Sequence, residues 1–352
     1  MQKNNRIGVL DSFRAIAIIA VLLYHYFYRW NNEDYPFYGA DFFKYGFKGV
    51  SFFFIISGFV ICYTLEKTPN FTSFWKKRFI RLFPSMLIAS VLTFVLLHLF
   101  DFRNTFEDSN HIRNLIVSLT FLPPNLFDWI MGTKSHYTYL NFSYWSLWPE
   151  IQFYVLSSSI YFFDRTKFIR NFIIASFNVI FLYLTLLHFN VNQVLIIQKI
   201  IHLFNLCEHI SFFLAGSLFY LIYKDSNDSK RYLIILGIVF ILQNYTLDKV
   251  NLISISIMYS LFFCFIYRPQ LLKFLENKIL INIGGASYFL YLIHEYVGVV
   301  FIKNSVGFFT QYSFITPLLI AIFMILFSIY YTRKIESKVM KQLTNYLFKN
   351  KR

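Results

Sequence analysis

The chain opens with an apolar run whose letters, from residue 8 to residue 27, are GVLDSFRAIAIIAVLLYHYF. A helix of about 20 such residues crosses the roughly 30 Å hydrocarbon core of a bilayer. Two ionisable residues, Arg14 and His25, interrupt the run. At about 100° per residue, His25 returns to the helix face of Arg14 roughly 16 Å further along the axis. A charge inside a membrane span is costly, so this stripe predicts a functional site.

Structural interpretations of the same two residues also exist. A histidine near a helix end is often a packed interfacial residue, and an arginine can extend its charged head to the lipid headgroups. The run has no small-residue cleavage site and contains Asp11 and Arg14, which favours a retained helix over a signal peptide.

Composition sets the class of protein. Of the 352 residues, 57% are hydrophobic and only 14% are charged, and the mean hydropathy is +0.51. Soluble domains are far more polar. We therefore predict an all-α, polytopic membrane helical bundle of about ten transmembrane helices, near 8–28, 47–66, 80–100, 144–163, 169–188, 209–223, 231–247, 250–267, 285–303 and 314–332.

The basic residues predict the orientation. With ten spans, 23 Lys and Arg residues fall on the side of both termini and 9 on the opposite side, with Arg14 inside the first span. The positive side of a membrane protein faces the cytoplasm, so we expect cytoplasmic N and C termini. The net charge of +15 then reflects topology. Scattered over short turns, these charges do not favour nucleic-acid binding.

Glu150 lies in the first turn of the fourth expected span, about 10 Å below the outer surface, a depth similar to that of His25. A histidine and a carboxylate at matched depth can act as a general base and its orienting partner. The alternative is a glutamate that stabilises the first turn of a helix.

Further polar groups lie in other spans. Arg78 and Arg81 share a helix face and could clamp a phosphate, although basic residues belong at a cytoplasmic helix end in any case. His294 and Glu295 lie near mid-membrane, and because they point about 100° apart, at least one should face an internal cavity. The Ser57-Gly58 pair is typical of close helix packing.

Several classes of site have no support in the sequence. The three cysteines are widely spaced and indicate neither a disulfide framework nor a metal site. Phosphate loops, HExxH and G-x-S-x-G motifs do not occur. The longest hydrophilic stretch, 101–141, is expected to lie outside the cell, where it is long enough to form a lid.

Taken together, these segments resemble the acyltransferase-3 family of integral membrane acyltransferases. The resemblance runs in order through Leu10-Asp11-Ser12-Phe13-Arg14-Ala15 with Tyr24-His25, through 49–59, Arg78-x-x-Arg81-Leu82-x-Pro84, Trp145-Ser146-Leu147-x-x-Glu150-x-Gln152-Phe153-Tyr154 and Ser287-Tyr288-x-Leu290-Tyr291-Leu292-x-His294. The motifs cover about 285 residues. Ile151 takes the place of a second acid, so Glu150 is the only carboxylate that its segment offers.

The resemblance implies an O-acyltransferase that moves an acyl group, by family frequency acetyl, from cytoplasmic acyl-CoA to a hydroxyl of an extracytoplasmic or lipid-linked glycan such as lipopolysaccharide O-antigen. By motif position, His25 and Glu150 are the implied catalytic residues and no metal is required. Acetyl-CoA is expected at Arg14, Arg78 and Arg81, and substrate at Trp145, Ser146, Tyr288 and His294.

The resemblance also implies a bacterial cytoplasmic (inner) membrane location. We expect one membrane domain over 1–335, a short basic cytoplasmic tail over 336–352 and no fused soluble domain. His25, oriented by Glu150, would deprotonate the acceptor for direct attack on the thioester, or would carry the acyl group itself. Alternatives are a transporter or flippase that uses Arg14, His25 and Glu150 as a path, an acyltransferase for a cytoplasmic metabolite, and a non-catalytic partner in a polysaccharide machine.

Overall fold

The computed structural model describes residues 7–30, 41–225, 229–245, 248–305 and 314–348. It is 85% helical, and the described residues contain no strand. The prediction of an all-α bundle is confirmed. Residues 349–352, at the end of the expected basic tail, lie outside the described residues.

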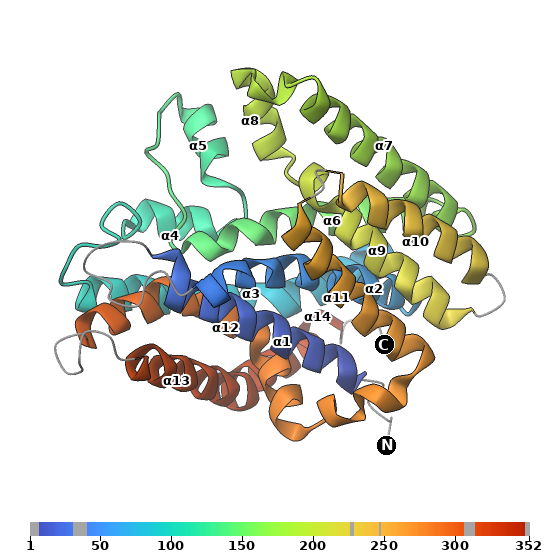
Figure 1. Cartoon of the computed structure of the whole chain (residues 1–352). Coiled ribbons are helices and arrows are strands. Elements are labelled where there is room, and N and C mark those ends of the chain that lie inside the picture. The colour runs from blue at the N-terminus through green and yellow to red at the C-terminus, as the bar shows by residue number, and fades with distance from the viewer. Residues whose placement is uncertain (1–6, 31–40, 226–228, 246–247, 306–313, 349–352) are drawn as a thin grey trace. The chain divides into compact units, whose positions relative to one another are not determined.

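Each predicted span corresponds to a helix. In chain order these helices are α1 (Gly8–Tyr24), α2 (Gly49–Glu66), α3 (Phe71–Phe100), α6 (Leu147–Phe163), α7 (Phe168–His188), α9 (Leu206–Lys224), α10 (Ser229–Gln243), α11 (Lys249–Tyr267), α12 (Lys278–Ser305) and α13 (Ile315–Tyr331) (Figure 1). The third helix begins nine residues before the predicted start, so Arg78 and Arg81 are helical, as their spacing requires.

Among the described residues, eight helical stretches are long and apolar enough to cross a membrane. They include all the predicted spans except α6 and α10, whose 17 and 15 residues fall short of the required length. At 1.5 Å per residue, these two helices reach roughly 26 and 23 Å.

Shorter elements join the spans. The stretch 101–141 contains two helices, α4 (Ile112–Leu119) and α5 (Pro124–Met131), and leads into η3 (Phe142–Ser146). The remaining connecting elements are η1 (His25–Arg29), η2 (Asp41–Lys48), η4 (Val191–Gln193), α8 (Leu195–Leu203), η5 (Pro269–Leu275), η7 (Thr332–Glu336) and α14 (Ser337–Phe348).

The chain forms two compact units, each built from separate stretches of sequence. Unit 1 comprises residues 1–50, 77–145 and 272–352, and unit 2 comprises residues 51–76 and 146–271. Unit 1 contains α1, most of α3, and α12 to α14, and unit 2 contains most of α2 and the helices from α6 to α11.

In unit 1, α1 packs along α12 (Figure 1). Two glycines of α12 permit the close approach: a Cβ on Gly284 would lie 1.7 Å from the Asp11 carbonyl oxygen, and one on Gly298 would lie 1.8 Å from the Tyr26 hydroxyl. Small residues let helix backbones approach closely in membranes. The two contacts fix the register of α1 on α12, and this register brings His25 to the middle of α12.

In unit 2, α2 and α9 approach through one glycine each. A Cβ on Gly58 would lie 2.1 Å from the Phe213 carbonyl oxygen, and one on Gly216 would lie 1.8 Å from that of Ile55. The packing prediction for Gly58 is confirmed. Its neighbour Ser57 differs from the expectation, because its hydroxyl donates a hydrogen bond to Glu150 Oε1 at 2.8 Å.

Candidate active site

His25 stands where the first helix changes its winding. The α-helix ends at Tyr24, and residues 25–29 continue it as one turn of π-helix. Such turns are rare and frequently mark functional sites, because the wider turn redirects the side chains around it. The His25 side chain is only 11% exposed. The structure therefore places an ionisable ring inside the protein.

A carboxylate lies directly beside this ring, and it belongs to Glu295 of α12. Nδ1 of His25 is 3.2 Å from Oε1 of Glu295, the distance of an ion pair, although the two groups are not aligned as a hydrogen bond. Glu295 is fully buried, and within the described part of the chain neither of its oxygens has a hydrogen-bond partner. The tautomer that this neighbour favours carries its proton on Nδ1, which leaves the lone pair of Nε2 free to accept a proton.

His294 completes the buried group. Its Nδ1 lies 2.9 Å from the Tyr291 carbonyl oxygen, which can only accept, so Nδ1 carries the hydrogen. Its Nε2 is then an acceptor, and it is buried without a partner among the residues that the structure describes. The rings of His25 and His294 meet edge to face with their centroids 5.1 Å apart. His294 and Glu295 are both 0% exposed, so both side chains are buried, where the sequence led us to expect that at least one faces an internal cavity.

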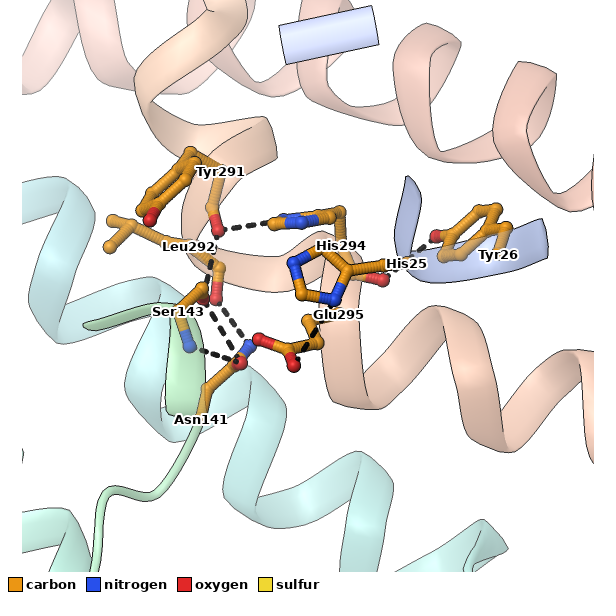
Figure 2. A network of polar contacts seen from close by, with 8 residues as sticks. All are labelled: His25, Tyr26, Asn141, Ser143, Tyr291, Leu292, His294 and Glu295. Atoms are coloured by element: carbon orange, nitrogen blue, oxygen red, sulfur yellow. Dashed lines mark hydrogen bonds and ion pairs between the residues drawn. The ribbon is translucent and has the colours of Figure 1, made fainter. Parts of the chain in front are cut away.

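Three side chains hold the turn of α12 that carries these residues (Figure 2). The Tyr26 hydroxyl donates to the His294 carbonyl oxygen at 2.8 Å. Asn141 Nδ2 donates to the Leu292 carbonyl oxygen at 2.9 Å, and the Ser143 hydroxyl donates to that of Tyr291 at 3.2 Å.

Asn141 and Ser143 were not predicted from the sequence. They are almost fully buried and stand where the 101–141 stretch passes into η3. Their only signal was their position just before the Trp145-Ser146 motif. Trp145 is half-buried at the end of the 77–145 stretch of unit 1, and Ser146 is buried at the end of η3, in unit 2.

Arg14 lies on α1, about three turns before His25 along the helix, as predicted. Its Nη1 lies 3.2 Å from Oδ1 of Asp11, and its side chain is 25% exposed whereas that of Asp11 is 2% exposed. The carboxylate compensates part of the arginine charge.

The predicted phosphate clamp has a buried acidic neighbour. Arg81 Nη1 lies 3.4 Å from Oε1 of Glu336, which is 3% exposed on the π-helical turn after α13. Tyr288 lies beneath the same guanidinium at 5.8 Å, and its hydroxyl donates to the Leu82 carbonyl oxygen. Arg78 is half-buried one turn before Arg81. Tyr288 thus belongs to the Arg81 surroundings, and Glu336 was missed by the sequence reasoning.

Glu150 lies in unit 2, where it accepts hydrogen bonds from Ser57, at 2.8 Å, and from the Tyr154 hydroxyl. Within the described residues of unit 1, the carboxylate beside His25 is that of Glu295. The predicted pairing of His25 with Glu150 would join the two units and stays a prediction.

The motif around Glu150 also fixes the break between α8 and α9. Nε1 of Trp148 and Nε2 of Gln152 both donate to the Leu203 carbonyl oxygen, at 2.7 and 2.6 Å. Oε1 of Gln152 accepts from the Leu206 N–H at 2.9 Å. The side chains of α6 therefore satisfy backbone groups that the helix break leaves open. In the described residues, no three His, Cys, Asp or Glu side chains group as metal ligands.

Comparison with known proteins shows the family to which the chain is similar. The acyltransferase-3 family, described as an acyltransferase domain, matches residues 7–333. The chain is 30% identical over 168 residues to a putative peptidoglycan O-acetyltransferase, YrhL, of Bacillus subtilis, covering 44% of this chain and 24% of that protein.

Two staphylococcal proteins are similar over shorter or comparable stretches. O-acetyltransferase OatA of Staphylococcus aureus is 35% identical over 96 residues, covering 25% of this chain and 14% of OatA. The putative O-acetyltransferase SACOL0978 is 28% identical over 166 residues, with 44% and 24% covered. The matches thus span about a quarter or less of each relative, and no solved structure matches. Because the family match covers nearly the whole chain, including every helix that holds the His25 site, the chain belongs to the acyltransferase-3 family of membrane acyltransferases.

Proposed function

We propose that this protein is a membrane O-acetyltransferase in which His25, supported by Glu295, activates a hydroxyl of a glycan acceptor. The observation that carries the proposal is the 3.2 Å approach of Glu295 Oε1 to His25 Nδ1 inside unit 1. A buried carboxylate beside one imidazole nitrogen makes the other nitrogen a competent base. The names of the relatives and the family match support acyl transfer as the reaction.

The transfer moves one proton and one acetyl group. Nε2 of His25 takes the proton of the acceptor hydroxyl, and the oxygen attacks the thioester carbonyl carbon of acetyl-CoA. The carbon–sulfur bond then breaks, an ester forms, and the imidazolium returns its proton to the departing CoA thiolate. Glu295 stabilises the imidazolium while it exists, since the positive charge then lies beside a buried negative one.

The donor is proposed to enter from the cytoplasm. Arg78 and Arg81 would bind the CoA phosphates, because guanidinium groups match phosphate geometry. Arg14, partly exposed along the first helix, would face the pantetheine arm. The excess of basic residues on the side of both termini supports this orientation and a location in the cytoplasmic membrane.

The acceptor is proposed to be an extracytoplasmic sugar hydroxyl. The name of the Bacillus relative favours peptidoglycan as the acceptor, and O-antigen of lipopolysaccharide is the alternative glycan. Both present secondary or primary hydroxyls that need deprotonation before attack.

Sealed proteoliposomes of known orientation test the proposal. We expect labelled acetyl-CoA to act only from the face that carries the termini, and an impermeant peptidoglycan or O-antigen fragment to be acetylated only from the opposite face. Acetylation of a small cytoplasmic metabolite with donor and acceptor on one face would favour the metabolite alternative. Movement of substrate across the membrane without ester formation would favour a transporter.

A further inference from the structure

The stretch between α3 and α6 presents apolar side chains outward. At the end of α5, Trp129, Ile130 and Met131 are 67%, 64% and 61% exposed. These three consecutive residues, which we call the α5 tip, point about 100° apart, so together they cover roughly 200° of the helix circumference. More than half of the helix end is therefore apolar and uncovered by unit 1.

The α5 tip belongs to a built structure. Gly132 ends the helix in the left-handed conformation, with φ of 68°, and the Thr133 N–H donates to the Asp128 carbonyl oxygen at 2.9 Å. The Asp128 carboxylate accepts from the Thr133 hydroxyl at 2.6 Å and from the His136 N–H at 3.0 Å. These bonds turn the one acidic side chain of the helix into the following loop and leave the apolar residues outside.

The neighbouring helix α4 also presents apolar side chains outward. Ile112 and Ile116, one turn apart, are each 60% exposed. Asn114 of the same helix is 0% exposed, and its amide donates to the Asp108 carbonyl oxygen at 2.9 Å and to the Thr138 hydroxyl at 3.0 Å. The buried side of α4 carries Asn114 and Ser118 with Val117, while two isoleucines face outward, unlike the polar outer face of a helix on a water-exposed surface.

Charge and position indicate what covers these residues. The stretch begins where α3, a helix long and apolar enough to span a membrane, ends at Phe100, and it leads through η3 into the apolar helix α6. Lys134 and His136 are exposed directly after the α5 tip. A tryptophan followed within a few residues by a lysine is typical of segments at a membrane interface, where the ring enters the acyl boundary and the ammonium meets lipid phosphate.

We propose that the α5 tip and the Ile112–Ile116 side of α4 are inserted into the lipid leaflet that adjoins the end of α3. Their occupant is the headgroup and acyl-chain boundary of phospholipid, at the depth where amphipathic helices lie. The stretch 101–141 then includes a membrane-interface segment and does not form a lid in water. This inference is independent of the proposed reaction, because it rests on exposure and charge alone.

Site-specific quenching tests the proposal. In reconstituted phosphatidylcholine–phosphatidylglycerol vesicles, the fluorescence of Trp129 is isolated as the difference between the unmodified protein and Trp129→Phe. We expect that difference spectrum to be blue-shifted and at least twofold quenched by lipids brominated near the headgroup, with little quenching by iodide.

A second measurement places a fluorophore directly. After replacement of Cys62, Cys207 and Cys264 by serine, a nitrobenzoxadiazole label is attached in Ile130→Cys and, as the matched control, in His136→Cys. Lipid-borne quenchers should act on the first variant and iodide on the second. Equal iodide access to Trp129 and to the two labels would overturn the proposal, and if Trp129→Ala then raised only the acceptor KM, the tip would be a sugar-stacking surface instead.

Discussion

Exchange of Glu295 for glutamine separates the two candidate partners of His25. The change keeps the shape of the side chain and removes its charge. Two unit charges 3.2 Å apart attract by about 5 kcal/mol at an effective dielectric constant of about 20. That attraction stabilises the imidazolium formed during transfer. The two groups are not aligned as a hydrogen bond, so we expect the exchange to cost less than this full attraction. The activation barrier should rise by about 3 to 5 kcal/mol, which lowers kcat by roughly 10²- to 10⁴-fold.

The assay measures labelled acetyl transfer to a glycan acceptor in proteoliposomes, with the amount of inserted protein determined for each variant. Glu276→Gln is the matched control, because Glu276 is exposed after η5 and distant in sequence from the site. Its activity should equal that of the unmodified protein. The KM for acetyl-CoA should change little in Glu295→Gln, since the lost interaction belongs to the transition state.

Glu150→Gln is the decisive comparison. Glutamine keeps an oxygen that can accept from Ser57 and Tyr154, so we expect a loss of less than about tenfold, or about 1.4 kcal/mol. The reasoning is refuted if Glu150→Gln loses 10²-fold or more while a well-inserted Glu295→Gln stays near full activity. In that case Glu150 is the partner of His25, as the sequence motif predicts.

Three further changes test other parts of the site. His25→Ala should lower acetylation by about 10²- to 10⁴-fold with membrane insertion unchanged, as quantified by glycan mass spectrometry. Gly298→Ala places a Cβ 1.8 Å from the Tyr26 hydroxyl and should lower both activity and the thermal unfolding midpoint, whereas Gly237→Ala, with nothing within 4 Å, should leave both intact. Arg78→Lys should raise the acetyl-CoA KM about tenfold, because an ammonium cannot form a bidentate fork; unchanged donor affinity would show that the residue serves topology alone.

The fold was largely predictable because membrane insertion imposes strong rules on sequence. Each span must be apolar over about 20 residues, and basic residues gather on one side. The helices therefore appear where the hydropathy places them. The short elements α4 and α5 were not predicted, since their apolar residues are separated by hydrophilic ones and the stretch reads as a water-exposed loop.

The sequence places individual ionisable residues such as His25, His294 and Glu295 within apolar segments, but it does not predict which of them are neighbours. Hydropathy gives the depth of a group along its own helix and does not say which helices are neighbours. Glu150 and Glu295 both offered a carboxylate, and only the contact of α1 with α12 brings one of them to His25 within unit 1. A signal was present in Gly284 and Gly298, which lie 14 residues, or about four turns, apart and so mark one close-packed face of α12.

Glu336 escaped prediction for a different reason. It is the only acid among residues 333–341, inside a basic stretch that the positive-inside rule explains without further function. The burial of Glu336 follows from the folded structure alone, in which its carboxylate lies beside Arg81 of α3. A single acid that interrupts a basic run after the last span is the pattern that could have pointed to it.

The π-helical turn at the end of the first helix explains how the adjacent residues His25 and Tyr26 both contact α12. With α-helical spacing, adjacent side chains point about 100° apart. The π-helical turn that starts at His25 holds more residues per turn, so adjacent side chains point in more similar directions. Both His25 and Tyr26 reach α12, one at Glu295 and the other at the carbonyl oxygen of His294. The base and the helix that carries its carboxylate are therefore joined at two adjacent residues. A change that restored regular α-helical winding after Tyr24 would have to give up one of these contacts, so the base and its partner would lose their alignment together.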